Sequence, residues 1–312
     1  MKIFFEERPI YKAPLEVLQH LYYYTTQYGL SVKQFTGEHQ KYWERLPERL
    51  QAASQSEDDL KSIINELEQL AKDSEARLRK RREQKDRGWA EKEIVLNAQL
   101  LSVLAAFPRQ ILADGFKKLT QSNLLPPELK IVDVSLLKDD GSPVFVFVEP
   151  DLLLLGNHHL LMVELKTRGG AKSSRNYPPS QLLNYLRLAA ECIESSSDNL
   201  PTAFSHLVLL PSSDLKWFDN YSEWVSVDSE IDGKLIIDAD KCIQLGGHKS
   251  SYDHENVRDL FYKIPIYYRS WEQLEEAFKL AVETYGDKKN MDHWIEVCRE
   301  LTDLAKVAGK YS

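Results

Sequence analysis

Two adjacent apolar stretches of this chain carry charged side chains where buried β-strands normally carry none. The stretch from Val144 to Leu155 contains Asp151, and the stretch from Leu160 to Thr167 contains Glu164 and Lys166. An unpaired charge costs several kcal/mol when it leaves water, so these side chains require compensating partners. A divalent metal ion is the natural candidate for that partner.

The turn between the two stretches decides which carboxylates meet. Gly156-Asn157 is a turn signal and predicts an antiparallel hairpin. A four-residue loop places Asp151 opposite Glu164, whereas a two-residue loop places Glu149 there and Asp151 on the diagonal. In both registers the carboxylates share one face of the sheet, and Lys166 joins them because it lies two positions after Glu164.

The ligand types in this group indicate which metal it prefers. Oxygen ligands without histidine or thiolate suit magnesium or manganese rather than zinc. Asp151 and Glu164 are therefore predicted metal ligands, and Lys166 is predicted to orient or deprotonate a water and to stabilise charge on phosphorus. This combination predicts metal-assisted phosphodiester hydrolysis. The alternative is a buried ion network of Asp, Lys and Glu without a catalytic role.

Hydrophobic patterning predicts the elements around this hairpin. Helices are distinguished by apolar positions with a period near 3.6, and strands by alternating or continuous β-branched runs. The element order predicts a mixed central sheet with helices on both faces. In chain order, the predicted elements are helices within residues 56–87 and Trp89 to Phe107, strands at Lys130 to Leu137, Val144 to Leu155 and Leu160 to Thr167, a helix at Ser180 to Ser195, a strand at Phe204 to Leu210, short strands at Trp224 to Val227 and Lys234 to Ile237, and helices at Ser270 to Tyr285 and Asp292 to Val307.

Composition excludes some classes of protein. A chain of 312 residues with 43% hydrophobic content is long enough for a large α/β core with added elements. It contains no uncharged apolar run of about 18 residues, and Met1 to Tyr11 is too charged for a signal peptide, so we expect a cytoplasmic protein that does not interact with membranes. The formal charge of -8 argues against a whole-surface affinity for nucleic acid, although it is compatible with a local basic face.

Two short motifs resemble a known family. Pro150-Asp151 followed by Glu164-Leu165-Lys166 resembles the motif of the PD-(D/E)XK nuclease superfamily, and Gln181 with Tyr185 resembles the QxxxY motif of its RecB-like and Cas4-like branch. The resemblance covers roughly Trp89 to Leu210. It implies a restriction-endonuclease-like core of αβββαβ order with added N-terminal and C-terminal helices. It also implies that Gln181 lies beside the metal site with a catalytic role and that Tyr185 lies near DNA.

The same family usually adds an acid from the helix before the first strand. The run from Glu91 to Val95 resembles the ExxLV-type start of archaeal Holliday-junction resolvases, which makes Glu91 a further catalytic residue and metal ligand. Glu93 is the reserve candidate. Alternatively, both are ordinary first-turn acids that the helix dipole favours.

Two basic segments are candidates for contact with nucleic acid. The loop from Arg168 to Tyr177 follows the predicted catalytic strand, and within it Lys172 and Arg175 are predicted to contact the phosphate backbone. The run from Arg77 to Arg87 is either a solvated helix face or a second phosphate contact. Each segment is also explained by an ordinary solvent-exposed surface.

The resemblance implies a Mg-dependent deoxyribonuclease acting in antiphage defence, restriction or DNA repair. The alternative is a non-catalytic or partner-activated subunit that binds nucleic acid and recruits a protein partner through the helical arm at residues 56–87. The expected domains are a helical region at 1–88, the nuclease core at 89–245 and a helical region at 246–312. DNA or RNA substrates, and cleavage of ends or of internal bonds, are left open.

Overall fold

The computed structural model divides the chain into two compact units. One unit comprises Met1–Arg8 and Arg109–Ser312, and the other comprises Pro9–Pro108. Within the second unit, Arg49 and Glu66 form a two-pronged ion pair. The residues that the structure describes are 2–7, 49, 56, 58–59, 61–63, 65–66, 69, 100–101, 103–137, 151–166, 179–195, 199–211, 223–246, 255–285 and 291–310.

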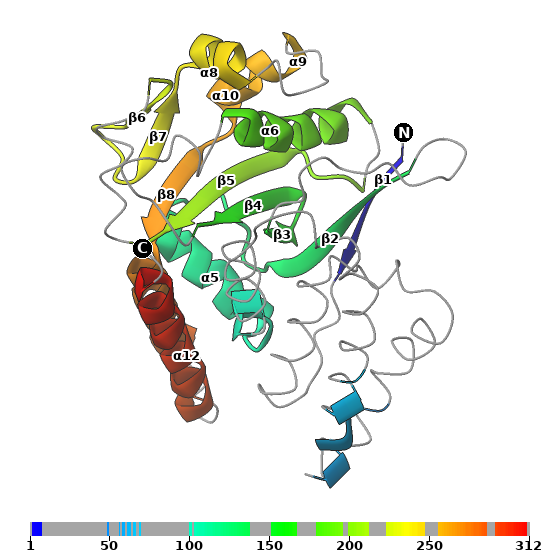
Figure 1. The fold of residues 1–312 in the computed structure, drawn as a ribbon, viewed down its shortest axis with the longest axis vertical. Coiled ribbons are helices and arrows are strands. Elements are labelled where there is room, and N and C mark those ends of the chain that lie inside the picture. The colour runs from blue at the N-terminus through cyan, green and yellow to red at the C-terminus, as the bar shows by residue number, and fades with distance from the viewer. Residues whose placement is uncertain are drawn as a thin grey trace. The chain divides into compact units, whose positions relative to one another are not determined.

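The first unit is built on a mixed sheet (Figure 1). Among the described residues the sheet has eight strands in the order β1-β2-β3-β4-β5-β8-β7-β6. Strands β1 to β4 run antiparallel, β4, β5 and β8 run parallel, and β8, β7 and β6 return to antiparallel pairing. The strands are β1 Lys2–Glu7, β2 Lys130–Leu137, β3 Leu152–Gly156, β4 His159–Leu165, β5 Ala203–Leu210, β6 Val225–Val227, β7 Lys234–Ile237 and β8 Ile266–Ser270.

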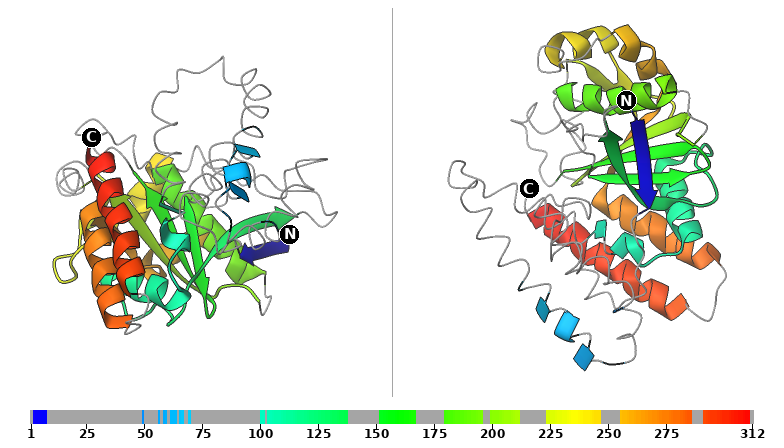
Figure 2. Two further views of the ribbon diagram at one scale, coloured as in Figure 1. Left: turned by 90° about the horizontal axis from the view of Figure 1, so that it is seen from below. Right: turned by 90° about the vertical axis from the view of Figure 1, so that its right-hand side faces the viewer.

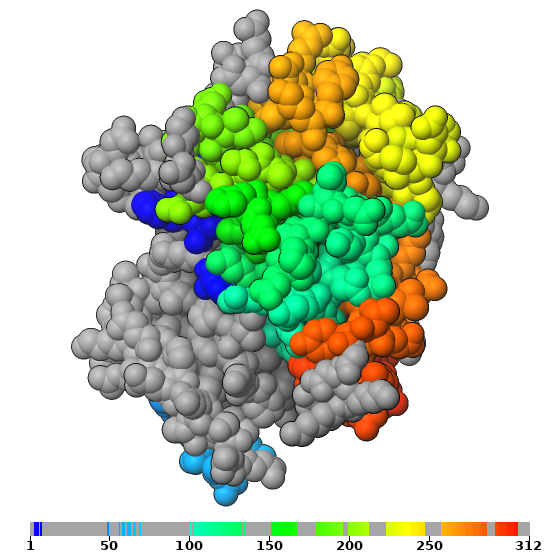
Figure 3. Space-filling view, turned by 180° about the vertical axis from the view of Figure 1, so that it is seen from behind, coloured from blue at the N-terminus to red at the C-terminus, as the bar shows by residue number. Residues whose placement is uncertain are grey.

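Helices cover both faces of this sheet (Figures 1 and 2). Helices α6 and α8 to α10 lie on one face, and α5, α11 and α12 lie on the other. Seen from behind in Figure 3, the segment that contains α5 forms part of the surface of the second face. The helices are α5 Arg109–Thr120, α6 Pro179–Glu194, α8 Ala239–Gly246, α9 Glu255–Arg258, α10 Leu260–Lys263, α11 Trp271–Tyr285 and α12 Met291–Lys310. No helix in the described ranges is long and apolar enough to cross a membrane.

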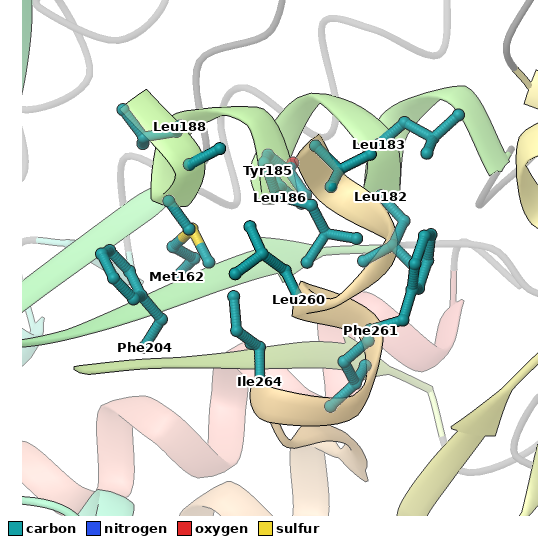
Figure 4. Packing of buried hydrophobic residues seen from close by; sticks show 14 of the residues in the cluster. Met162, Leu182, Leu183, Tyr185, Leu186, Leu188, Phe204, Leu260, Phe261 and Ile264 are labelled. Atoms are coloured by element: carbon teal, nitrogen blue, oxygen red, sulfur yellow. The ribbon is translucent and has the colours of Figure 1, made fainter. Parts of the chain in front are cut away.

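Strand β4 lies in the middle of the sheet and is buried along its whole length. Its even-numbered residues Leu160 and Met162 belong to the apolar cluster formed with α6, as Figure 4 shows for Met162. Because side chains alternate along a strand, Glu164 faces α6 as well. Helix α6 connects β4 to the parallel neighbour β5, so its first turn lies near the carboxyl end of β4.

The prediction of a mixed sheet with helices on both faces is confirmed. Strand β2 has the predicted bounds, and β4, β5, α6, α11 and α12 begin and end close to theirs. The two predicted short strands form β6 and β7, which pair antiparallel as a hairpin, and β7 also pairs with β8, so the hairpin extends the sheet. Of the predicted strand at residues 144–155, the described part forms β3.

Several elements were not predicted. Strand β1 pairs with β2, and β8 lies between β5 and β7. The sheet therefore takes strands from all three predicted domains, and the predicted boundaries at residues 88/89 and 245/246 do not delimit it. Helices α5 and α8 to α10 were also missed, and α5 rather than residues 89–107 is the helix directly before β2. Strand partners are chosen by long-range pairing, which local periodicity does not report.

Candidate functional site

The hairpin register brings Asp151 to the level of Glu164. Strand β3 pairs with β4 from Leu152 opposite Val163 through Gly156 opposite His159. Asp151 is the residue directly before this ladder and Glu164 directly follows Val163, so the two stand at the same level. Of the two predicted registers, the structure therefore adopts the one that places Asp151 rather than Glu149 opposite Glu164.

The turn itself differs from the prediction by one residue. Asn157 and His158 form a two-residue turn with φ of 42° and 62°, as a type I′ hairpin requires. Gly156 pairs with His159 at the end of the ladder, and a Cβ at this position would lie 2.0 Å from the backbone oxygen of Glu128, so the position requires glycine. The glycine therefore serves a close backbone approach and not the turn itself.

Glu164 is the centre of the site. Its side chain is almost completely buried, with 3% exposure. Oε1 accepts hydrogen bonds from Lys166 Nζ and Gln181 Nε2, and Oε2 accepts one from the Tyr185 hydroxyl. The structure thus brings together Glu164, Lys166 and Gln181, three of the residues predicted to be catalytic.

The backbone of Lys166 is held on both sides. Its amide donates to the Leu209 carbonyl of β5 at 2.8 Å, and its carbonyl accepts from the indole Nε1 of Trp271 at 3.2 Å. Trp271 is buried and is the first residue of α11. Ser270 and Gln273 cap that helix reciprocally, since each backbone amide donates to the side-chain oxygen of the other residue. Lys166 is thereby anchored from both β5 and the opposite face of the sheet.

Asp151 lies at the edge of the same site and is half-buried. Its Oδ2 accepts a hydrogen bond of 2.8 Å from the backbone amide of Leu165. Leu165 stands between Glu164 and Lys166, so this bond directs the Asp151 carboxylate toward the end of β4. The carboxylates of Asp151 and Glu164 are thus anchored at the same end of one hairpin.

Tyr185 lies inside the protein rather than on a nucleic-acid surface. Its side chain is 1% exposed, and besides donating to Glu164 its hydroxyl accepts from Gln181 Nε2 at 3.3 Å. Its ring lies 4.8 Å from the ring of His206, centroid to centroid. This placement gives Tyr185 contact with the Glu164 carboxylate in place of the predicted contact with DNA.

His206 is a buried residue of this site that was not predicted from the sequence. It lies on β5 and its Nδ1 is 3.0 Å from the Met162 carbonyl. Burial is the main cause that lowers the pKa of His206 to about 3; the hydrogen bond to Met162 opposes this, and the charge of Lys166 adds to it. The imidazole is therefore neutral near pH 7. A histidine inside an otherwise apolar strand has no motif that would mark it.

The carboxylates of Asp151 and Glu164 are oxygen donors that fit a hard divalent cation. A carboxylate has about four acceptor positions, and within the described residues three of those on Glu164 take hydrogen bonds. One position is left for a cation, and the second carboxylate, Asp151, is at the same level. Oxygen donors of this kind fit Mg²⁺ or Mn²⁺. In the part of the chain that the structure describes, no three His, Cys, Asp or Glu side chains gather into a larger group.

Other predicted site residues lie outside the described residues. These are Glu149, Glu91, Glu93, Lys172 and Arg175.

Helix α5, which directly precedes β2, does not supply the expected helix acid. Its one acidic residue is Asp114, which accepts a hydrogen bond from Thr284 of α11 and lies 3.5 Å from Lys118. These contacts lie on the face of the sheet opposite to α6. Asp114 therefore serves helix packing.

Comparison with family models, curated proteins and solved structures found no match to this chain.

Proposed function

We propose that the chain is a metal-dependent nuclease of the PD-(D/E)XK type that hydrolyses phosphodiester bonds in DNA with Mg²⁺ or Mn²⁺. The observation that carries this proposal is the buried contact between Glu164 of β4 and Lys166, which directly follows β4, with Asp151 at the same level of the hairpin. Gln181, from the first turn of α6, donates to the same carboxylate. Antiphage defence, restriction and DNA repair are the processes in which we expect this activity.

The arrangement of the elements supports the proposal. The order α5-β2-β3-β4-α6-β5 is αβββαβ, the order expected of a restriction-endonuclease-like core. In that core the candidate residues would lie on the second and third strands and on the helix that follows them. Glu164 lies on the third of these strands and Gln181 on the helix that follows, and Asp151 directly precedes the second strand.

The energetic cost of the site favours a function over a structural ion network. Replacing a buried ion pair with apolar residues of similar volume is often neutral or stabilising. The face of β4 that bears Glu164 otherwise packs Leu160 and Met162 into an apolar cluster. A leucine-like side chain at position 164 would suit this surrounding better than a carboxylate, so stability alone does not explain Glu164 and Lys166.

Each residue of the site has a proposed role. Asp151 and Glu164 would hold the cation, which supplies polarisation of a phosphoryl oxygen and a more acidic water. Lys166 orients the water that attacks phosphorus and stabilises the negative charge that develops on the phosphate oxygens. Gln181 donates to Glu164 Oε1 and holds that carboxylate in one orientation.

The residues outside the described ranges complete the proposal. Glu91 is proposed as a third acid near the cation. Lys172 and Arg175 are proposed to contact the phosphate backbone of the nucleic acid, where their charges would neutralise phosphates.

A partner-activated subunit is the second candidate, and one observation favours it. Glu164 is only 3% exposed and its two oxygens already take three donors. Opening such a site by a bound partner would expose the carboxylate to substrate. Activity of the isolated chain, compared with activity that appears only with a partner, separates the two candidates.

The test is cleavage of circular and linear, single- and double-stranded DNA, and of RNA, by the purified full chain. We expect cleavage with Mg²⁺ or Mn²⁺, its loss in a chelator, and its loss in Asp151→Ala. Asp114→Ala is the matched control, because it removes a carboxylate that serves helix packing. Unchanged cleavage by Asp151→Ala would show that the assignment is wrong.

A further inference from the structure

We propose that His206 is a positioning residue for the Glu164 carboxylate and that it acts through Tyr185. This inference rests on the proposed function, because the carboxylate that it positions is a proposed metal ligand. Neither the sequence motifs nor the proposed roles above involve His206.

The first link of the proposed path joins β5 to β4. His206 and Met162 are register partners on these parallel strands, and His206 Nδ1 lies 3.0 Å from the Met162 carbonyl oxygen. A carbonyl oxygen only accepts hydrogen bonds, so Nδ1 donates and carries the ring proton. This bond fixes both the tautomer and the plane of the imidazole.

The second link joins β5 to α6. The rings of His206 and Tyr185 lie 4.8 Å apart at 48°, and their side chains are 0% and 1% exposed. Tyr185 belongs to the same buried cluster as Leu182 and Leu186, which are labelled with it on α6 in Figure 4. Close packing of this kind leaves the tyrosine ring few alternative positions.

The third link returns to β4. The Tyr185 hydroxyl donates to Glu164 Oε2 while Gln181 donates to Oε1, so both carboxylate oxygens are held from α6. The path starts at Met162 and ends at Glu164, two positions further along the same strand. It therefore ties β4, β5 and α6 into one closed set of contacts around the carboxylate.

This arrangement predicts which quantities depend on His206. The side chain is completely buried and cannot touch the nucleic acid, so the KM for DNA should not change. The orientation of Glu164 should change, and with it the affinity for metal and kcat. Loss of a residue that orients a metal ligand typically lowers metal affinity or activity by about 10- to 100-fold.

Four variants of the full chain test the path. His206→Asn keeps an amide donor for the Met162 carbonyl but removes the ring, and His206→Phe keeps a ring against Tyr185. Tyr185→Phe removes only the hydroxyl. His159→Asn is the matched control, since His159 is also a buried histidine of the sheet, at the far end of β4, where it bonds to Ser205 Oγ at 2.9 Å.

The main measurements are Mn²⁺ binding by calorimetry, kcat and KM for DNA cleavage, and thermal unfolding. We expect His206→Asn and Tyr185→Phe each to weaken Mn²⁺ binding by about 10- to 100-fold, with an unchanged KM. His206→Phe should recover most of the affinity, and His159→Asn should retain all of it. The double variant of His206→Asn and Tyr185→Phe should be no weaker than Tyr185→Phe alone. Additive losses in the double variant would overturn the claim that His206 acts through Tyr185.

A second readout does not depend on activity or metal. The Tyr185 hydroxyl proton should give a low-field NMR signal, identified by its loss in Tyr185→Phe. It should move in His206→Asn and stay in place in His159→Asn. Absence of the signal from the wild type, or an unchanged signal in His206→Asn, would overturn the positioning role. A wild type that neither binds Mn²⁺ nor cleaves DNA would instead refute the proposed function, while the hydroxyl signal would still decide the role of His206.

Discussion

Lys166 and Arg269 are both buried cations of the same sheet, but their partners are of different kinds. Lys166 is 8% exposed and pairs with the carboxylate of Glu164. Arg269 is 2% exposed, and its Nε, Nη1 and Nη2 donate to the backbone carbonyls of Leu119, Tyr268 and Asp232 at 2.6, 3.0 and 2.7 Å. One cation is matched by a buried charge and the other mainly by peptide dipoles.

The difference shows that a buried cation does not by itself mark a functional site. The guanidinium of Arg269 joins the end of α5, the β6–β7 turn and β8, as a planar group with several donors can. Its role is explained by packing. The ion pair of Lys166 is with Glu164, only two positions earlier in the chain, so this pair does not itself connect distant elements. The carboxylate that Lys166 compensates, rather than the lysine, is the feature that calls for a function.

The largest effects are expected at the Lys166 site, where two variants distinguish the role of charge pairing in stability from the role of the pair in catalysis. Lys166→Met leaves Glu164 buried without its cation, and breaking such a pair costs about 3 kcal/mol of unfolding free energy. Adding Glu164→Gln removes the isolated charge and should restore much of this stability. Nuclease activity should nevertheless fall by about 100- to 1,000-fold in both variants. Urea denaturation and plasmid cleavage measure the two quantities, and a fully active double variant would refute the catalytic role of the pair.

At the Arg269 site we expect substitutions to lower the stability of the protein without lowering its nuclease activity. Arg269→Met leaves three carbonyl groups without their donor, which costs about 3 kcal/mol. Arg269→Lys should recover only part of this, because an ammonium group cannot reproduce the planar arrangement of donors. The kcat of the folded protein should not change. A variant that unfolds at the wild-type urea concentration but loses kcat would contradict the structural role.

A smaller effect is expected at Gly233, which contacts Arg269. Gly233 has φ of +65°, and a Cβ at this position would lie 1.2 Å from Arg269 Nη1. Gly233→Ala should therefore cost about 2 kcal/mol of unfolding free energy. Gly233→Asn distinguishes backbone strain from the contact with Arg269, because asparagine tolerates positive φ but still carries a Cβ. Equal losses in both variants indicate the steric contact, and full stability of Gly233→Ala would contradict the close approach.

A change in stability that depends on pH is expected at His206. The pKa of this imidazole is about 3 in the folded protein, against an ordinary value of 6.5. The folded state therefore binds fewer protons than the unfolded state between these values. The contribution of His206 to the free energy of unfolding is therefore fully present above pH 6.5. It decreases by about 1.4 kcal/mol per pH unit as the pH falls toward 3.

The variant His206→Asn should reduce the dependence of the unfolding free energy on pH, because one proton fewer is taken up on unfolding. Urea midpoints between pH 5 and pH 7 provide the measurement. Burial also lowers the pKa of His159, so His159→Asn should reduce the slope in the same direction. An unchanged slope in His206→Asn would show that the imidazole is not kept neutral by folding.

Much of the fold around the site could be predicted because it depends on local patterns. The apolar runs at β2, β4 and β5 and the periodicity of α6 appear directly in the sequence. In contrast, β1 contains Lys2 and Glu6, and β8 contains Arg269, so neither reads as a typical buried strand. Both are strands because long-range partners complete their hydrogen bonds. Arg269 is tolerated because it donates hydrogen bonds to the distant carbonyls of Leu119 and Asp232 and to the neighbouring carbonyl of Tyr268.

The sequence by itself determined that Glu164 and Lys166 share one face of a strand and that Gln181 and Tyr185 share one face of a helix. These relations follow from the two-residue period of a strand and the near-four-residue repeat of a helix. Only the tertiary structure decided that Tyr185 and Gln181 point at Glu164, that Asp151 rather than Glu149 stands opposite it, and that His206 lies behind Tyr185. These relations depend on the exact turn and on the path of α6 between β4 and β5, which are fixed by packing between residues far apart in the chain.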